Sequence, residues 1–74
     1  MNIELTKPEG NAFALMHIAT RLCTQLGIDD SERDALLKDM KSSDYANLVK
    51  VFWLKFNSVV NIYSNGEPYV PANI

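Results

Sequence analysis

The stretch SSDYANLVKVFWLKFNS, residues 42–58, carries the clearest helical pattern in this chain of 74 residues. With a helical period, five of its apolar side chains fall within an arc of about 100°, the width of a stripe that faces a core. They are Tyr45, Leu48, Val49, Phe52 and Phe56. We expect Ser42 or Ser43 to cap this helix and Asn57 and Ser58 to end it. The rest of the fold should pack against its aromatic face.

Two more helices are predicted before it. Residues 12–26 place apolar side chains on one stripe, and Gly27 is a typical helix C-terminal stop, where a positive φ is wanted. A second, shorter helix begins between residues 28 and 31, with Asp29 at capping-box spacing and Ser31 as the competing cap. It ends at Lys41, with acidic residues early and lysines late, as the helix dipole favours.

The chain ends carry strand patterns. Ile3 and Leu5 alternate with polar residues, which predicts a half-buried strand. Residues 59–63 are β-branched and aromatic, and Asn65-Gly66 is a strong hairpin signal. Residues 67–71 are expected to return as a short strand, at a sheet edge because it contains a proline. The prediction is one α+β domain spanning residues 1–74, in the order β-α-α-α-β, with a two- or three-stranded sheet.

A chain of this length buries only about 60% of the surface that its unfolded form exposes, so the core should be thin. The helical stripes and the inward faces of the strands together define the predicted core. Its members are Ile3, Leu5, Leu15, Ile18, Ala19, Leu22, Leu26, Leu36, Leu37, Met40, Leu48, Val49, Phe52, Phe56, Val60 and Ile62.

Composition favours a cytoplasmic protein. The net charge of −2 and the absence of a Lys/Arg run give nothing that attracts nucleic acid or an anionic membrane. No run of about 18 apolar residues predicts a membrane span, and the first residues lack the pattern of a signal peptide. The single cysteine, Cys23, cannot form an internal disulfide, and we interpret it as a small buried hydrophobe.

The stretch KPEGNAFAL, residues 7–15, invites comparison with a phosphate-binding loop. Such loops use several glycines and a lysine that opens the helix. Here one glycine is present, Lys7 precedes the turn, Pro8 has no N–H to donate and Glu9 would repel an anion. A turn followed by a helix cap at Asn11 is therefore the favoured interpretation, and anion binding is the alternative.

No catalytic constellation, metal site or cofactor site is predicted. His17 lies on the helix face opposite the apolar stripe, and no second histidine is present to share a metal. The acidic residues near the start of the second helix lack the ligand spacing of a calcium loop and are interrupted by Arg33. These residues are Asp29, Asp30, Glu32 and Asp34.

Several apolar residues miss the predicted stripes and form a candidate interaction surface, together with one histidine. The set is Phe13, Met16, His17, Val51, Trp53 and Leu54. Aromatic and methionine side chains are enriched at interfaces. Either this set binds a protein partner, or the second helix and the C-terminal segment cover it. Open strand edges in so small a sheet also favour a homodimer.

A nucleic-acid-binding module is the alternative from another functional class. In that interpretation Lys7, Lys50 and Lys55 contact phosphates, and aromatic side chains stack on bases. The stacking residues would be Tyr63, Tyr69 or Trp53. The acidic pI near 5.1 and the absence of a basic stripe make it the weaker interpretation.

Several short strings resemble those of very small tailed-bacteriophage accessory proteins of unassigned function. They are Gly10-Asn11-Ala12-Phe13, Leu26-Gly27, Met40, Ser43-Asp44-Tyr45 and Asn47-Leu48, with Phe56 ahead of a terminal strand. The resemblance covers residues 3–62 and brings no active-site residue with it. It implies a phage-type accessory factor that acts in the bacterial cytoplasm. Together with the apolar set, it predicts a non-enzymatic protein that binds and modulates a host protein.

Overall fold

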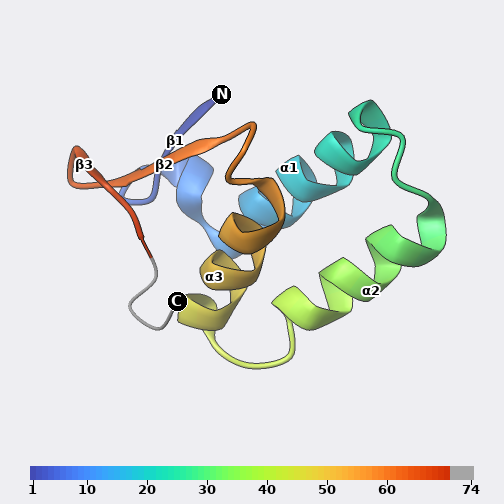
Figure 1. The fold of residues 1–74 in the computed structure, drawn as a ribbon. Helices are drawn as coiled ribbons and strands as arrows, with labels where there is room; N and C mark the ends of the chain where they lie inside the picture. Colours follow the sequence, from blue (N-terminus) through green and yellow to red (C-terminus); the bar gives the residue numbers. More distant parts are fainter. Residues whose placement is uncertain (71–74) are drawn as a thin grey trace.

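The computed structural model describes residues 1–70 and has the predicted α+β architecture, with three helices and a small three-stranded sheet (Figure 1). The elements are β1 Asn2–Glu4, the 3-10 helix η1 Pro8–Gly10, α1 Ala12–Gln25, α2 Asp30–Met40, α3 Tyr45–Phe56, β2 Asn61–Ser64 and β3 Glu67–Pro68. None of the helices in this part of the chain is both long enough and apolar enough to cross a membrane.

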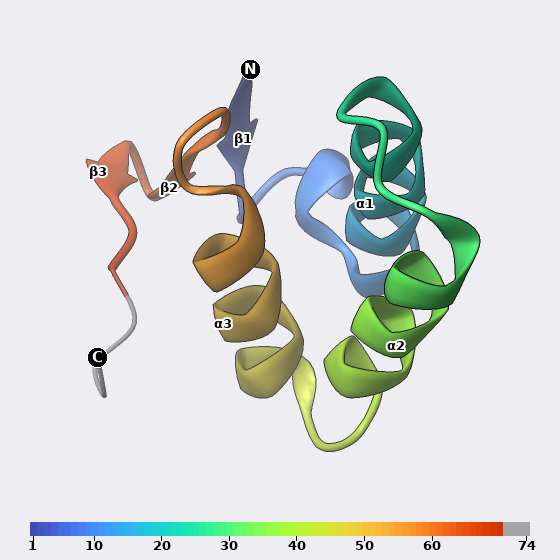
Figure 2. The ribbon, with the colours of Figure 1, turned by 45° about the vertical axis from the view of Figure 1, so that its right-hand side comes forward.

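The sheet has the order β1-β2-β3, so β2 is the central strand. β1 pairs with β2 in parallel, with Ile3 opposite Ile62. β2 and β3 form an antiparallel hairpin whose turn residues, Asn65 and Gly66, have φ angles of 54° and 80°. Two positive φ angles in a two-residue loop match the right-handed twist of the flanking strands. The helices lie to one side of the strands, with α2 farthest away (Figures 1 and 2).

Each α-helix begins at a side-chain cap. Asn11, Asp29 and Asp44 each accept a hydrogen bond from the backbone N–H three residues on, at 2.8 to 2.9 Å. The caps at Asn11 and Asp29 confirm the prediction, as does Gly27, which follows α1 with a φ of 72°. The prediction of Ser42 or Ser43 as the cap of α3 is wrong, because that helix begins at Tyr45 and Asp44 precedes it directly.

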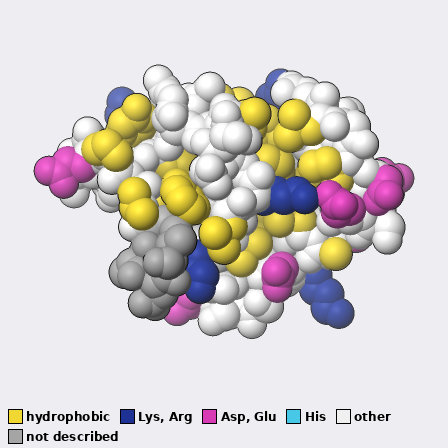
Figure 3. All heavy atoms as spheres, in the orientation of Figure 1, with side chains coloured by type: hydrophobic (Ala, Val, Ile, Leu, Met, Phe, Trp, Pro, Cys, Tyr) yellow, Lys and Arg dark blue, Asp and Glu magenta, His cyan; other side chains and the backbone are white. Residues whose placement is uncertain are grey.

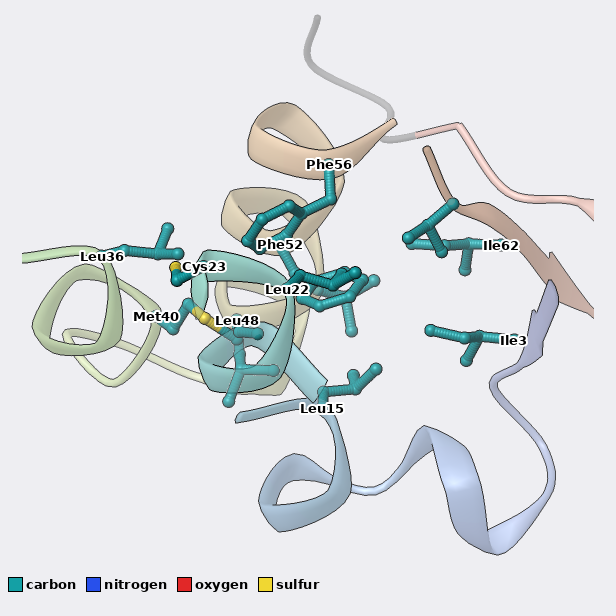
Figure 4. Packing of buried hydrophobic residues seen from close by; sticks show 13 residues of the cluster. Ile3, Leu15, Leu22, Cys23, Leu36, Met40, Leu48, Phe52, Phe56 and Ile62 are labelled. Carbon is teal, nitrogen blue, oxygen red and sulfur yellow. The ribbon is translucent and has the colours of Figure 1, made fainter. Parts of the chain in front are cut away.

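The core lies between the helices and the inward face of the sheet (Figure 4). Ile3 and Ile62, from neighbouring strands, point toward the rings that α3 contributes. Those rings, Phe52 and Phe56, are fully buried, with centroids 5.1 Å apart and planes tilted by 55°. Most of the predicted core is confirmed. The buried set is Ile3, Leu15, Ala19, Leu22, Cys23, Leu36, Met40, Leu48, Val49, Phe52, Phe56, Val60 and Ile62, with Leu5, Ile18 and Leu37 partly buried against it.

Two residues assigned to buried stripes are exposed instead. Leu26 is 51% exposed because α1 ends at Gln25, so Leu26 is the C-cap and no longer follows the helical stripe. Tyr45 is 44% exposed because it occupies the first turn of α3, at the margin of the core. Its hydroxyl donates a hydrogen bond to the carbonyl oxygen of Gly10, so it joins α3 to η1 rather than filling the interior.

The strands are shorter than their sequence patterns. β1 ends at Glu4 because the chain turns there, with the Lys7 N–H donating to the Glu4 carbonyl. Val59, expected at the start of a strand, is 41% exposed and donates its backbone N–H to the Phe56 carbonyl, which extends the end of α3. β3 covers only Glu67–Pro68 of the expected residues 67–71, and Pro71 lies outside the described residues.

Phe52→Ala should lower the free energy of unfolding by about 3–5 kcal/mol, since a fully buried ring is removed from a thin core. A loss of that size is a large fraction of the stability of a small domain. Thermal melts followed by circular dichroism measure it. A variant that melts within a few degrees of the wild type would contradict the register of α3.

Candidate functional site

The six residues of the predicted interaction surface do not form one patch. Phe13, Met16 and His17 lie on α1, where Phe13 is 86% exposed and His17 is also exposed. Met16 is partly buried against the core. The α1 surface therefore contributes one protruding aromatic ring, since its methionine is already used in packing.

Val51 and Leu54 lie in a shallow apolar groove between α2 and α3, with a volume of about 250 Å³. Val51 packs against the core, whereas Leu54 is 50% exposed. The Lys55 Nζ atom lies 2.8 Å from a carboxylate oxygen of Glu32, and this ion pair joins the two helices beside the groove. α2 thus lies beside Val51 and Leu54 without burying Leu54.

Trp53 lies in a different groove, formed by the end of α3, β2 and the segment that follows the hairpin turn. Its volume is about 300 Å³. Among residues 1–70, the lining contains three aromatic side chains, two asparagines and no charged residue. The lining residues are Trp53, Asn57, Val60, Asn61, Ile62, Tyr63, Pro68 and Tyr69. We call this the aromatic groove.

Some hydrogen-bonding groups of the aromatic groove are bound within the protein, and others have no partner among residues 1–70. The Nδ2 atom of Asn57 donates to the Trp53 carbonyl at 3.0 Å, and that of Asn61 donates to the Asn2 side chain at 3.1 Å, so both amides are oriented by the protein. Within residues 1–70, no hydrogen bond involves the Trp53 indole N–H or the hydroxyls of Tyr63 and Tyr69. Burial raises the pKa of the Tyr69 hydroxyl, which keeps it in the neutral, donating form. These three donors therefore have no hydrogen-bond partner among residues 1–70.

The nucleic-acid alternative named Trp53, Tyr63 and Tyr69 as stacking residues, whereas the predicted protein-binding surface included only Trp53 of the three. Pro68, Asn57 and Asn61 were missed as lining residues. The sequence feature that indicates this grouping of residues is the Asn65-Gly66 turn. It returns the chain beside β2 and so brings Tyr69 toward α3.

Two of the lysines proposed to contact phosphates lie beside carboxylates. Lys55 is paired with Glu32. Lys7 lies in a third hollow, whose lining also includes the carboxylates of Glu4 and Glu9. A nucleic-acid backbone would have to compete with Glu32 for Lys55 and would meet the negative charges of Glu4 and Glu9 in the hollow of Lys7, which weakens the phosphate contacts of that alternative.

The stretch Lys7–Leu15 forms a tight corner. Gly10 is buried, and a Cβ atom built on it would lie 2.5 Å from the Cα atom of Leu5, so only glycine fits there. The Glu9 carboxylate accepts the backbone N–H of Glu4 at 3.0 Å and would face any anion brought to this corner. The turn and the Asn11 cap are confirmed, and both have structural roles.

Glu4 is the most heavily hydrogen-bonded side chain in the described part of the chain. One carboxylate oxygen accepts from the backbone N–H and hydroxyl of Thr6, at 3.0 and 2.7 Å, and from the Asn65 N–H at 3.1 Å. The other accepts from the Gly66 N–H at 2.7 Å. These donors, those of Thr6 first, lower the pKa of Glu4 from 4.5 to about 2, while burial opposes the shift. Glu4 thus fastens β1 to the hairpin turn.

The acidic residues at the start of α2 and the thiol of Cys23 show no sign of a catalytic or metal site in the described residues. Arg33 binds Asp30 and Asp34 at 3.2 and 3.1 Å, so the acidic start of α2 is partly neutralised. Within residues 1–70, no three His, Cys, Asp or Glu side chains are grouped so that they could hold a metal ion. Burial raises the pKa of the Cys23 thiol, which disfavours the nucleophilic thiolate.

Comparison with known proteins adds no relative: no protein-family model, no curated protein and no solved structure matches this chain. The resemblance to small phage proteins therefore stays a prediction. The face drawn in Figure 3 shows hydrophobic side chains in a broken band rather than a single patch. The aromatic groove is the best-defined binding feature because it combines concave shape, aromatic rings and available donors.

The lowered pKa of Glu4 predicts that the folded protein loses stability in acid. Because the folded-state pKa lies below the unfolded value, the stabilisation is present above pH 4.5 and is lost as the pH falls toward about 2. The melting temperature of the wild type should therefore fall more steeply over this range than that of Glu4→Gln, which cannot titrate. Glu9→Gln is the matched control, since it keeps the four Glu4 contacts. Parallel pH profiles for the wild type and Glu4→Gln would contradict the role of Glu4.

Proposed function

We propose that this protein is a non-enzymatic interaction protein, a phage-type accessory factor that binds and modulates a host protein in the bacterial cytoplasm. The observation that carries the proposal is the uncharged aromatic groove of Trp53, Tyr63 and Tyr69. Aromatic side chains with a free donor at one end are the side chains that dominate binding at protein interfaces. The phage origin rests on the resemblance of the GNAF and SDY-type strings.

The chemistry of the groove favours an extended, proline-rich peptide as its ligand. Proline-rich segments dock in aromatic-lined grooves, and their backbone offers many carbonyl acceptors but few N–H donors. The indole N–H of Trp53 and the hydroxyls of Tyr63 and Tyr69 supply the matching donors. A volume of about 300 Å³ is at the lower end for ligand pockets, which suits a short segment. The uncharged lining needs no ion pair from the ligand.

Binding of single-stranded nucleic acid is the second candidate, because the same three rings could stack on bases. The absence of a cation among the lining residues disfavours it, since phosphate contacts supply most of the affinity of such complexes. Strong salt dependence of binding, together with loss of the bound material on nuclease treatment, would identify this function.

The protein should capture a host protein from bacterial lysate, and nuclease should not abolish the capture. Trp53→Ala should weaken the complex about 30-fold, as expected for a hot-spot residue worth ~2 kcal/mol. Titration of the purified partner, or of a proline-rich peptide from it, measures this change. Because Trp53 also packs against the core, Trp53→Phe tests the indole N–H with the packing largely kept.

Phe13→Ala is the matched control, because it also removes an aromatic ring but lies outside the aromatic groove. Its affinity should equal that of the wild type. If Phe13→Ala abolishes capture while Trp53→Ala does not, the partner binds α1 and the groove is the wrong surface. Capture that disappears with nuclease in every variant would replace the proposal with the nucleic-acid alternative.

Self-association through Phe13 is a separate part of the proposal. Pairing through β1 is disfavoured, because the Glu4 N–H and carbonyl on its outer edge already bond to Glu9 and Lys7. β3 has two residues, one of them a proline. A dimer would therefore use the exposed ring on α1, where a two-fold axis would bring two copies of Phe13 together.

The wild type should be a dimer at ~100 μM, well above the micromolar dissociation constants of ordinary specific contacts. Phe13→Asp should be a folded monomer, because an 86% exposed side chain contributes little to the core. Light scattering after size exclusion gives the mass, and circular dichroism on the same sample checks the fold. Leu54→Asp is the control on the other apolar surface. A monomeric wild type would remove the dimer from the proposal.

A further inference from the structure

The turn that joins β2 to β3 combines a reactive sequence with an unusual restraint. Asn65 and Gly66 are both exposed, and their φ angles of 54° and 80° are left-handed. Both backbone N–H groups donate to the same side chain, the Glu4 carboxylate, at 3.1 and 2.7 Å. The donors and the acceptor are 61 and 62 positions apart in the chain.

We propose that Asn65 is a site of spontaneous deamidation and that the Glu4 carboxylate holds the reaction in check in the folded protein. An asparagine followed by glycine is chemically suited to this reaction, because no side chain on Gly66 hinders the attack. The exposed turn admits the water that the second step needs. No enzyme, metal or cofactor is required.

The reaction has two balanced steps. The Gly66 backbone nitrogen loses its proton to solvent base and attacks the Asn65 Cγ atom; a new N–Cγ bond forms, the Cγ–Nδ2 bond breaks, and the departing nitrogen leaves as ammonia. Water then adds to one of the two carbonyls of the cyclic imide and opens it. The product at position 65 is aspartate or, with the backbone routed through Cγ, isoaspartate. One water enters, one ammonia leaves, and no electrons are transferred.

Glu4 opposes the first step in two ways. The Gly66 N–H that must be deprotonated donates to a negatively charged oxygen at 2.7 Å, and removing its proton would place two negative charges side by side. The second bond, from the Asn65 N–H, fixes the left-handed conformation of the turn. Rotation of the Asn65 backbone toward the attack geometry therefore requires both bonds to break.

The product would alter the structure at the same point. A carboxylate at position 65 would add a negative charge to a residue whose backbone N–H already binds the Glu4 carboxylate, and the two charges would repel each other. An isoaspartate also lengthens the backbone by one carbon, which the two-residue turn cannot accommodate while β2 and β3 keep their register. Deamidation would therefore loosen β3 and, with it, the Pro68 and Tyr69 wall of the aromatic groove.

The test compares Glu4→Gln with the wild type at mildly alkaline pH, where backbone amides lose their protons more readily. Peptide mapping by mass spectrometry follows the loss of Asn65 and separates aspartate from isoaspartate. We expect Asn65 in Glu4→Gln to deamidate roughly tenfold faster, since a hydrogen bond to a charged acceptor is replaced by a weaker one. Glu9→Gln, the same chemical change without a contact to the turn, should match the wild type.

Urea shows whether the folded contact causes the difference. In a concentration that unfolds both chains, wild type and Glu4→Gln should deamidate at the same, faster rate, because the contact between residues so distant in sequence is lost. Equal deamidation rates for the two folded proteins would contradict the proposal that Glu4 slows the reaction. A difference that persists in urea would overturn it too, and an Asn65 that stays intact in unfolded wild type would show that this position is not a deamidation site.

Discussion

Parallel pairing of β1 with β2 is the interaction on which the rest of this structure depends. It joins residues 59 positions apart, so the pairing carries the entropic cost of closing a long stretch of chain into a loop. Three residue pairs make the contact, and only Ile3 and Ile62 turn buried side chains toward the helices. Without β1, the β2–β3 hairpin would have only two strands, and its packing against the core through Ile62 and Tyr69 would be its remaining support. The core, the hairpin turn and the aromatic groove therefore all depend on the pairing of β1 with β2.

The helices could be predicted from the sequence because their signals are local. The 3.6-residue spacing of large side chains defines α3, and Asn11 and Asp29 mark helix starts by residue type. The cap of α3 was misplaced because Ser42, Ser43 and Asp44 are all good caps. The cap is the residue directly before the first helical residue, and residue type alone does not show that this first residue is Tyr45.

The strand arrangement was only partly predictable. The Asn-Gly turn indicated the hairpin, but nothing local to β1 indicates that its partner is β2 or that the two run in parallel. The role of Glu4 was hidden for the same reason. Its alternation with Ile3 and Leu5 marks it as an outward-facing strand residue, and only the folded topology brings the hairpin turn to its carboxylate.

The candidate surface was divided because periodicity treats each helix alone. Trp53 and Leu54 are neighbours in sequence and both miss the buried stripe of α3. In the structure, α2 packs beside one and the hairpin returns beside the other, so they enter separate grooves. Phe13 remains 86% exposed because no element within residues 1–70 packs over it. Residues that miss a stripe are thus identified well by sequence, whereas their grouping depends on the tertiary arrangement.

The same arrangement explains why so small a domain can carry a shaped groove at all. Val60 and Ile62 belong to the core and also line the groove, and the aromatic residues Trp53, Tyr63 and Tyr69 lie beside them at the margin of the core. One wall, Pro68 and Tyr69, is held by the short hairpin, by the Tyr69 N–H bond to the Ile62 carbonyl at 2.8 Å and by the packing of Tyr69 against the core. Because a preformed groove binds more tightly than one that must be ordered first, the fastening of the hairpin by Glu4 would support the proposed recognition as well as stability.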